Sequence, residues 1–402
     1  MRAVGQIGLL MAPKQRLPAV KKIKFQNEDV LPKTVVMTTP SLNPNANVSG
    51  ISSVVSGLIF ASQHPGLAFD WMISPAIVGK RDRQGRGVLW LVSQIAVLIN
   101  FFSLIRRTRP TIVHINGPLS ALAILRDWAL IRMAKFFELA VIYHLHGGTF
   151  VHDGPPSGLI RRIALASLDE ASVIIVLSDL EASSIARIYN TNPDKIRVLR
   201  NAVRTANECP VKPTGGRLRV LSIGRLSPEK GLSVLCDAIE ADPDLRDQLQ
   251  IRMHGAGDLE AEITSRLAAS LGDAFSFEGV AGGKKKSEAY AWADVVIMPS
   301  LREGLPMVLL ESMASGVVPI TTSVGSISEV IRDRSNGVMI EKGSPQSLTL
   351  GLHQAVEMKK TGVLHDLAMN AHRTVQETYS LPKQVQLLGQ IYTEIIKGAT
   401  AK

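Results

Sequence analysis

The stretch RLRVLSIGRLSPEKG, residues 217–231, contains a strand candidate followed by a loop. Its first eight residues, 217–224, are rich in valine, leucine and isoleucine, and the glycine and proline of GRLSPEKG end this run. The helix-like segment GLSVLCDAIEA, residues 231–241, follows directly. A strand, a loop and a helix in this order form the repeating unit of a parallel sheet that helices cover on both faces.

The same alternation extends in both directions from this stretch. Later strand candidates are residues 249–255, 274–280, 293–300, 317–323 and 337–343, and earlier ones are 33–40, 111–117, 140–148, 172–178 and 195–201. Helical patterns separate most of them, for example at residues 51–63 and 259–272. The sequence therefore predicts an α/β fold with two doubly wound domains of similar size.

The domain boundaries follow from breaks in this pattern. Residues 205–216 accumulate proline and glycine without apolar periodicity, which predicts a linker. We expect the other boundaries to give a basic leader at 1–32, a first domain at 33–204, a second domain at 217–380 and a C-terminal helix at 381–402. In the leader, KQRLPAVKKIK follows the short apolar run IGLLMA where a signal peptide would have its cleavage site, so we do not expect a signal peptide.

Composition and charge narrow the class of protein. The chain has 402 residues, of which 46% are apolar and 20% charged, as in an ordinary globular protein. Two cysteines cannot form a disulfide framework and indicate a reducing compartment. Residues 1–200 carry 23 basic and 12 acidic side chains, against 22 and 23 in residues 201–402. Such a basic half attracts phosphates of nucleic acid, anionic lipid or a phosphorylated acceptor, although a merely solvated face is an equally open explanation.

Residues 88–105, VLWLVSQIAVLINFFSLI, are about long enough to span a bilayer. Polar residues interrupt the segment at Ser93, Gln94, Asn100 and Ser103, and a strand candidate follows directly. We therefore expect a helix that is buried in a core or lies at a membrane surface.

Ligands of open parallel sheets bind at the carboxyl ends of the strands, so the loops there carry the functional residues. In the loop GRLSPEKG, Gly224 allows a tight turn, and Arg225 and Lys230 lie on either side of Pro228. Two cations at a junction between a strand and a helix suit a diphosphate. The alternative is a surface loop with two solvated charges.

A second loop of this kind contains EGLPMVLLE, residues 303–311. Gly304 and Pro306 keep its first part from being helical, and a helix can begin near Met307 because proline is favoured at helix starts. Glu303 then precedes the helix and lies near the reacting centre, whereas Glu311 falls in the second turn. There Glu311 could accept hydrogen bonds from a sugar diol such as ribose.

The backbone between the two acids has a role of its own. The amides from Leu305 to Val308 form a helix N-terminus, which favours phosphate. The apolar side chains at residues 307–310 are predicted to be core.

The ordered set GRLSPEKG, EGLPMVLLE, ASGVVPITTSVGSISEVI and NGVMI resembles the donor half of family 4 retaining glycosyltransferases across most of residues 217–345. This resemblance implies the GT-B architecture, in which two Rossmann-like domains face each other across a cleft that holds the active site. It implies that Arg225 and Lys230 hold the donor diphosphate. It also implies that Glu303 lies near the transferred sugar and that Glu311 binds the nucleotide ribose.

The first half matches the family more loosely. HLHGG, residues 144–148, resembles the loop whose histidine, here His146, faces the sugar, although a histidine near a strand end is often structural. NVSGISS, residues 47–53, corresponds to the family's glycine loop, with Ser49 before Gly50 where two glycines are usual. RNAV, residues 200–203, replaces the usual Asn-Gly, and Asn201 is left out of the predicted site.

The chemistry that this set supports is transfer of a hexosyl group from a nucleotide-diphosphate sugar. Preorganised cations and amides stabilise the charge of the departing diphosphate. Since no Asp-x-Asp pair is placed to hold a metal, we expect no metal and no cofactor beyond the nucleotide sugar. Glu303 would stabilise positive charge on the sugar.

Other classes of protein fit less well. GAGDLE, residues 255–260, has Glu260 in place of the third glycine of a dinucleotide fingerprint, and no GxxxxGK[ST] loop supports an ATPase. Aromatic residues make up only 5%, which disfavours nucleic-acid binding. A sugar-nucleotide epimerase of the same architecture and a non-catalytic membrane-surface protein remain as alternatives.

The donor base, the donor sugar and the acceptor stay open. By analogy with bacterial polysaccharide assembly, we expect a saccharide or lipid-linked saccharide acceptor. The basic half beside an apolar helix favours an anionic membrane, with the protein peripheral on the cytoplasmic face of the inner membrane.

Overall fold

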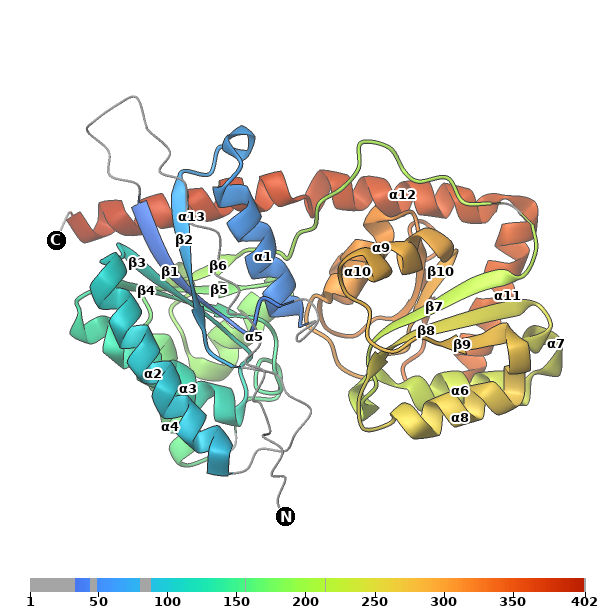
Figure 1. Cartoon of the computed structure of the whole chain (residues 1–402), viewed down its shortest axis with the longest axis horizontal. Coiled ribbons are helices and arrows are strands. Elements are labelled where there is room, and N and C mark those ends of the chain that lie inside the picture. The colour runs from blue at the N-terminus through green and yellow to red at the C-terminus, as the bar shows by residue number, and fades with distance from the viewer. Residues whose placement is uncertain (1–32, 44–48, 80–87, 156, 214, 401–402) are drawn as a thin grey trace, which may run out of the picture. The chain divides into compact units, whose positions relative to one another are not determined.

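The computed structural model describes residues 33–43, 49–79, 88–155, 157–213 and 215–400. Residues 33–402 form one compact unit. The predicted leader, residues 1–32, lies outside the described residues, and so do residues 47 and 48 of the predicted glycine loop. Two six-stranded sheets follow one another along the chain (Figure 1).

The first sheet has the strand order β2-β1-β3-β4-β5-β6, and every neighbouring pair is parallel. Its strands are β1 (Lys33–Thr39), β2 (Trp71–Ile77), β3 (Ile112–Gly117), β4 (Ala140–Leu145), β5 (Val173–Val176) and β6 (Ile196–Val198). Its helices are α1 (Gly50–Ser62), α2 (Val88–Thr108), α3 (Ala121–Phe136), α4 (Leu159–Glu170) and α5 (Asp179–Tyr189).

The second sheet has the order β12-β11-β10-β7-β8-β9 and is parallel throughout. Its strands are β7 (Leu218–Arg225), β8 (Leu249–Ala256), β9 (Phe275–Phe277), β10 (Val295–Met298), β11 (Val318–Thr322) and β12 (Val338–Ile340). The helices of this half are α6 (Leu232–Ala241), α7 (Pro243–Arg246), α8 (Glu260–Leu271), α9 (Gly283–Trp292), α10 (Met307–Ala314), α11 (Pro345–Thr361), α12 (Val363–Thr378) and α13 (Leu381–Thr400).

These sheets confirm the predicted fold class of two Rossmann-like, doubly wound domains. In the second sheet, the chain builds outward from β7 through β8 to one edge and then from β10 to the other. The loops after β7 and β10 therefore leave the same end of neighbouring strands. Such a switch point is where open α/β sheets bind their ligands.

One strand, β2, was absent from the sequence prediction. Pro75 lies within it, opposite Met37 of β1, and proline usually argues against a strand because it has no N–H to donate. β2 is the edge strand of its sheet, with β1 as its single neighbour, so one side of β2 needs no ladder hydrogen bonds. The edge position explains why the proline is tolerated.

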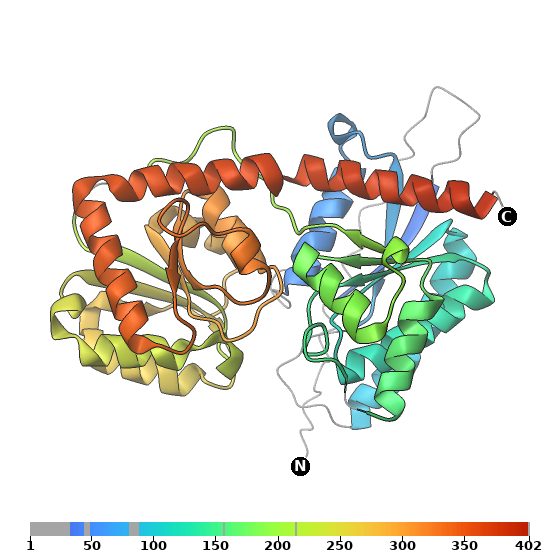
Figure 2. The same ribbon diagram turned by 180° about the vertical axis from the view of Figure 1, so that it is seen from behind.

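The C-terminal helix α13, red in Figures 1 and 2, packs against α1 and β4 of the first half. Its Tyr392 is fully buried, and the Tyr392 ring lies 4.9 Å from that of Trp71 in an edge contact. The same hydrophobic cluster contains Met37 of β1 and Met313 of α10. The last helix of the chain thus completes a core of the first domain.

Helix α2 spans the apolar segment predicted at residues 88–105. Phe101 and Ile105 are buried, whereas Ile95 and Ile99 are 59% and 62% exposed. Among the described helices, none is long and apolar enough to cross a membrane.

Candidate active site

The loops after β7 and β10 approach each other closely. Gly231 has φ of +64°, and a Cβ on it would lie 2.0 Å from the carbonyl oxygen of Pro299. The amide of Leu301 donates to the carbonyl oxygen of Glu229 at 2.8 Å. Only glycine permits this approach, which brings the predicted phosphate loop beside the predicted sugar loop.

Lys230 and Glu303 form an ion pair across these loops. Lys230 Nζ lies 2.6 Å from Glu303 Oε1, and the Ser300 hydroxyl donates to the same oxygen at 2.7 Å. The Glu303 side chain is 8% exposed and that of Lys230 is 29% exposed. The structure therefore brings two predicted site residues together, and each neutralises the other at the carboxyl ends of the strands.

The helix N-terminus expected near Met307 is present. α10 begins at Met307, with Pro306 as its N-cap, and no side chain caps it with a hydrogen bond. The first amides of a helix have no intrahelical partner, so this end favours an anion. Met307, Leu309 and Leu310 are buried and Val308 is partly buried, as predicted for residues 307–310, and Leu305 is buried as well.

Backbone contacts fix the loop that carries Glu303. A Cβ on Gly325 would lie 2.1 Å from the carbonyl oxygen of Glu303, and the amide of Ser326 donates to the carbonyl oxygen of Gly304 at 3.2 Å. Asn201, which the sequence analysis left out, donates to the carbonyl oxygen of Leu305 at 2.7 Å. The Asn201 side chain thus helps to hold the loop that carries Glu303.

The other two predicted residues of the phosphate loop lie at the end of the strand. Gly224 and Arg225 are the last two residues of β7, and Arg225 is exposed. Arg225 therefore lies at the carboxyl end of the strand, where a guanidinium can reach a phosphate.

Glu311 is occupied by two side chains of α9 that the sequence analysis missed. Lys286 Nζ lies 2.7 Å from Glu311 Oε1 and 2.5 Å from Oε2, and the Tyr290 hydroxyl donates to Oε2 at 2.9 Å. Burial raises the pKa of Tyr290 well above its usual value, so this hydroxyl stays a donor. A ribose diol that binds Glu311 would therefore compete with Lys286 for the carboxylate.

His146 follows β4 and is half-buried. Its Nε2 donates to Asn116 Oδ1 at 2.8 Å, and burial lowers the pKa of His146 to about 3, so the ring is neutral at physiological pH. A Cβ on the next residue, Gly147, would lie 3.6 Å from the Cα of Gly304. The His146 loop and the Glu303 loop are therefore in contact.

Gly50 is the first residue of α1, and a Cβ on it would lie 3.5 Å from Met307 Cγ. Ser49, at the position of the family's other glycine, is the N-cap of α1 and accepts from the amide of Ser52 at 3.2 Å. The start of α1 thus lies beside the start of α10.

A further carboxylate near this loop is Glu181, in the first turn of α5. It is fully buried, its Oε2 accepts from the amide of Leu177 at 2.9 Å, and its Oε1 would lie 3.2 Å from a Cβ on Gly304. Burial raises the pKa of Glu181 to about 7. In the sequence this residue reads only as part of a helix start, so no signal marked it.

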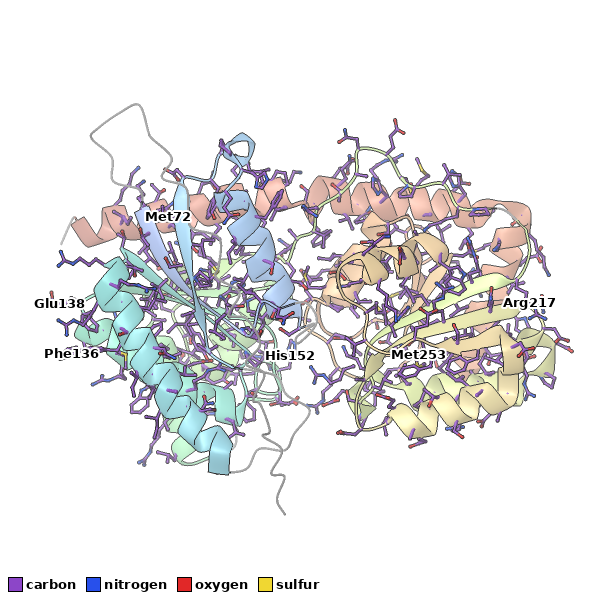
Figure 3. The ribbon with its side chains drawn as sticks, in the orientation of Figure 1. Met72, Phe136, Glu138, His152, Arg217 and Met253 are labelled. Atoms are coloured by element: carbon purple, nitrogen blue, oxygen red, sulfur yellow. The ribbon has the colours of Figure 1, made fainter. Side chains whose placement is uncertain are left out.

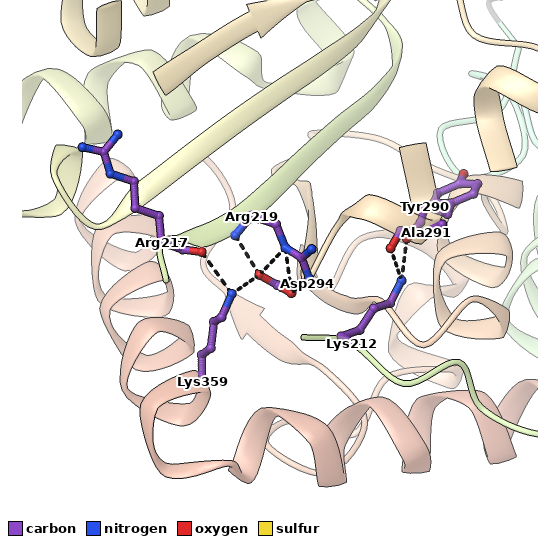
Figure 4. A network of polar contacts seen from close by, with 7 residues as sticks. All are labelled: Lys212, Arg217, Arg219, Tyr290, Ala291, Asp294 and Lys359. Carbon is purple, nitrogen blue, oxygen red and sulfur yellow. Dashed lines mark hydrogen bonds and ion pairs between the residues drawn. The ribbon is translucent and has the colours of Figure 1, made fainter. Parts of the chain in front are cut away.

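A charged network lies at the opposite end of the second sheet (Figure 4). Asp294, which precedes β10, is 3% exposed and binds Arg219 and, at 2.5 Å, Lys359. Burial alone would raise the pKa of Asp294, but hydrogen bonds from Arg219 and Lys359 outweigh it and hold the pKa below its usual value. Lys212 donates to the carbonyl oxygens of Tyr290 and Ala291. This network is structural, because it lies at the amino ends of the strands.

Across the described ranges, no three His, Cys, Asp or Glu side chains are grouped to hold a metal ion. Metal independence stays a prediction, because other ligands and the bound nucleotide could still recruit a cation.

Comparison with known proteins places this chain in a family. Residues 59–207 match the profile described as Glycosyltransferase Family 4, and residues 207–374 match that of Glycosyl transferases group 1. An uncharacterized glycosyltransferase of Methanocaldococcus jannaschii is 27% identical over 251 residues, which are 58% of this chain and 62% of that protein. The chain spans about half the length of other curated relatives it matches.

Solved structures show the same fold. Sucrose-phosphate synthase of Thermosynechococcus elongatus superposes with a TM-score of 0.74 at 18% identity, covering 91% of this chain and 100% of that one. HepE of Anabaena, in complex with UDP-glucose, has a TM-score of 0.69 at 16% identity, covering 90% and 99%. At these identities, the likeness to both structures shows a shared fold. Across residues 59–374, the chain belongs to glycosyltransferase family 4.

Proposed function

We propose that this chain is a retaining glycosyltransferase that moves a hexosyl group from a nucleotide-diphosphate sugar to an acceptor without a metal ion. The observation that carries the proposal is the 2.6 Å contact between Lys230 and Glu303 at the switch point of the second sheet. It pairs a cation suited to a phosphate with a carboxylate suited to a cationic sugar. The uncapped N-terminus of α10 begins four residues after Glu303.

In the proposed reaction, the bond between the sugar C1 and the phosphate oxygen breaks, and its electron pair stays on the diphosphate. Lys230, Arg225 and the amides at the start of α10 stabilise that charge. The acceptor oxygen forms the new bond on the face that the diphosphate leaves, and its proton passes to a phosphate oxygen. Glu303 stabilises the positive charge that develops on the sugar.

We propose a UDP-hexose as the donor to test first. The support is the Anabaena protein, whose structure was solved with UDP-glucose and whose fold matches this chain. In this proposal Glu311 receives the ribose hydroxyls, which displace Lys286 from the carboxylate.

We propose that the acceptor is a saccharide on a lipid, presented at the cytoplasmic face of an anionic membrane. The support is the outer face of α2 and α3. Phe136, labelled in Figure 3, is 78% exposed at the end of α3, and Ile95 and Ile99 are exposed on α2. A shallow, mostly apolar hollow of about 580 Å³ lies between these helices and is lined by Leu98, Phe102, Trp128, Ala129, Arg132, Met133 and Phe136.

Basic side chains border this apolar face. Arg106, Arg107 and Arg109 are exposed at the end of α2 and just after it. Cations beside apolar groups suit the phosphates and acyl chains of an anionic membrane surface. The two free cysteines fit a reducing compartment such as the cytoplasm.

The test combines binding and turnover of the purified chain. UDP, GDP, ADP and their hexose derivatives are screened for thermal stabilisation, because a specific ligand raises the midpoint of unfolding. The stabilising donor is then incubated with membrane lipid extract in excess EDTA. We expect a glycolipid product whose anomeric configuration is that of the donor.

Three other results would each overturn part of the proposal. Epimerised nucleotide sugar without an acceptor product would identify an epimerase. Activity lost with EDTA and restored by magnesium or manganese would remove metal independence. Stabilisation by none of the nucleotides would support the non-catalytic membrane protein instead.

A further inference from the structure

Three histidines and one asparagine lie together on β3, on β4 and just after β4. His114 and Asn116 belong to β3, His144 belongs to β4, and His146 follows β4. The first three are buried, and His146 is half-buried. Since Asn116 pairs with His144 in the sheet register, all four side chains lie within one small region at the centre of the sheet.

The orientation of the Asn116 side chain is fixed by its neighbour β1. Asn116 Nδ2 donates to the carbonyl oxygen of Thr38 at 2.8 Å. The backbone N–H of Asn116 also donates to Thr38 Oγ1 at 2.8 Å. With Nδ2 used in this way, Oδ1 is the atom that faces His146 Nε2 at 2.8 Å.

This orientation decides which nitrogen of His146 carries the hydrogen. A side-chain carbonyl oxygen accepts hydrogen bonds and cannot donate them. His146 Nε2 must therefore be protonated. Because the ring is neutral, Nδ1 carries no hydrogen and is an acceptor.

Ring contacts hold His146 from the other side. The rings of His144 and His146 lie 4.1 Å apart with an interplanar angle of 31°. His144 Nδ1 lies 3.1 Å from His114 Nε2, and His114 Nδ1 lies 2.7 Å from the Tyr392 hydroxyl of α13. Burial lowers the pKa of His114 to about 3 and that of His144 well below its usual value, so these rings are also neutral.

We propose that Asn116 is a positioning residue that fixes His146 in the Nε2–H tautomer, so that Nδ1 accepts a hydrogen bond from a hydroxyl of the transferred sugar. This inference rests on the proposed function, since it takes His146 to face the donor sugar. The contact between Gly147 and Gly304 places the His146 loop against the loop of Glu303, where that sugar is expected. His146 then selects for a donor hydroxyl and does not exchange protons with the reaction.

The first experiment is independent of any substrate. The full chain is labelled with ¹⁵N-histidine, and long-range ¹H–¹⁵N spectra report which ring nitrogen is protonated; His146→Gln assigns the signal. We expect His146 to be protonated at Nε2 alone between about pH 6 and 8. Protonation at Nδ1 in the wild-type protein would overturn the proposal, whatever the enzymatic activity.

The second experiment changes the partner. In Asn116→Asp, a carboxylate beside Nε2–H raises the pKa of His146, because it favours the imidazolium form. Below that pKa, Nδ1 carries a hydrogen and cannot accept from the sugar. We expect kcat/KM of Asn116→Asp to fall by about 10-fold or more, relative to the wild-type value at the same pH, as the pH is lowered through the new pKa of His146.

Asn190→Asp is the matched control, because Asn190 is exposed at the C-cap of α5. It adds the same charge to the same domain and should keep the wild-type pH profile. If kcat/KM of Asn116→Asp is lower than the wild-type value by the same factor at every pH, Asn116 has a purely structural role and the proposal is overturned. If no nucleotide sugar is turned over, the proposed function fails, and the labelled spectra still decide the tautomer.

Discussion

Asn201 Nδ2 donates to the carbonyl oxygen of Leu305 at 2.7 Å, and both residues are 4% exposed. The bond ties the segment after β6 to the loop that carries Glu303. A buried carbonyl that loses its partner costs about 1–3 kcal/mol. The position of that loop therefore depends on a side chain from the other sheet.

Asn201→Ala should lower the free energy of unfolding by about 1–3 kcal/mol, because the carbonyl oxygen of Leu305 loses its donor. It should also raise the KM for the donor, since the loop loses a fixed position. Urea unfolding and donor titration measure the two effects. Asn207→Ala, at an exposed position, should change neither. An unaltered unfolding midpoint in Asn201→Ala would show that the loop does not need this bond.

Glu303→Gln and Lys230→Ala should separate two electrostatic roles. Glu303→Gln removes a charge near a cationic sugar, so kcat should fall by about 100-fold. It also releases Lys230 from its ion pair, so the variant should bind UDP at least as tightly as the wild-type protein does. Lys230→Ala should both weaken the binding of UDP and lower kcat. Calorimetric titration of UDP and initial rates give both quantities.

The control for Glu303→Gln is Glu341→Gln, an exposed acid after β12. Full turnover of folded Glu303→Gln would exclude Glu303 as the group at the sugar. Weaker UDP binding in the same variant would contradict the inference that Lys230 is shared between Glu303 and the diphosphate.

Lys286 should compete with the nucleotide ribose for Glu311. Glu311→Gln should raise the donor KM with little change in kcat, because a ribose contact is made equally in the ground and transition states. Lys286→Ala should lower the KM, since both carboxylate oxygens become available. Lys284→Ala, on the same helix but 91% exposed, is the control. A higher KM in Lys286→Ala would mean that Lys286 itself binds the donor.

Asp294→Asn should destabilise the second domain by about 3–5 kcal/mol at neutral pH, because the variant leaves Arg219 and Lys359 without their charge partner. The pKa of Asp294 is lower in the folded protein than in the unfolded one, so its stabilisation is present above the unfolded value and fades as pH falls through the folded value. The gap between wild type and variant should therefore shrink below about pH 4. Denaturant unfolding at several pH values measures it, with exposed Asp273→Asn as the control. If the difference in unfolding free energy between wild type and variant stays constant at acidic pH, the stabilisation does not come from the charge of Asp294.

Binding to anionic vesicles should depend on the apolar face of α2 and α3. Ile99→Ser and Phe136→Ser should each reduce co-sedimentation with anionic vesicles, and high salt should release the wild-type protein because exposed charges are screened. Leu350→Ser, at a residue equally exposed on α11, should bind normally. Equal binding to neutral vesicles would point to hydrophobic insertion, and absence of binding to either would remove the membrane surface as a partner.

The strands could be predicted because their apolar runs and the loops that end them are local in sequence. β2 was missed, since Pro75 is acceptable only at a sheet edge, and edge position depends on the order of all six strands. The start of α10 at Met307 was predicted from Pro306, which acts within a few residues.

Contacts between elements that are far apart in the sequence could not be predicted. The contact between Lys230 and Glu303 requires β10 to lie beside β7, although β8 and β9 come between them in sequence. Only the folded chain brings Lys286 and Tyr290 of α9 to Glu311 of α10. In the sequence, the spacing of these two residues indicates only a basic helix face. Asn201 was left out of the predicted site because RNAV differs from the family's usual Asn-Gly. Its hydrogen bond to the carbonyl oxygen of Leu305 depends on the folded structure.

The position of Tyr392 has a consequence for how the chain is made. Trp71 and His114, synthesised early, both rest against the Tyr392 ring, which lies in the last helix. During translation, the first sheet leaves the ribosome long before the side chain that fills its core. The N-terminal half therefore exposes an apolar face until α13 has been synthesised, which makes the nascent chain a substrate for chaperones that shield such surfaces.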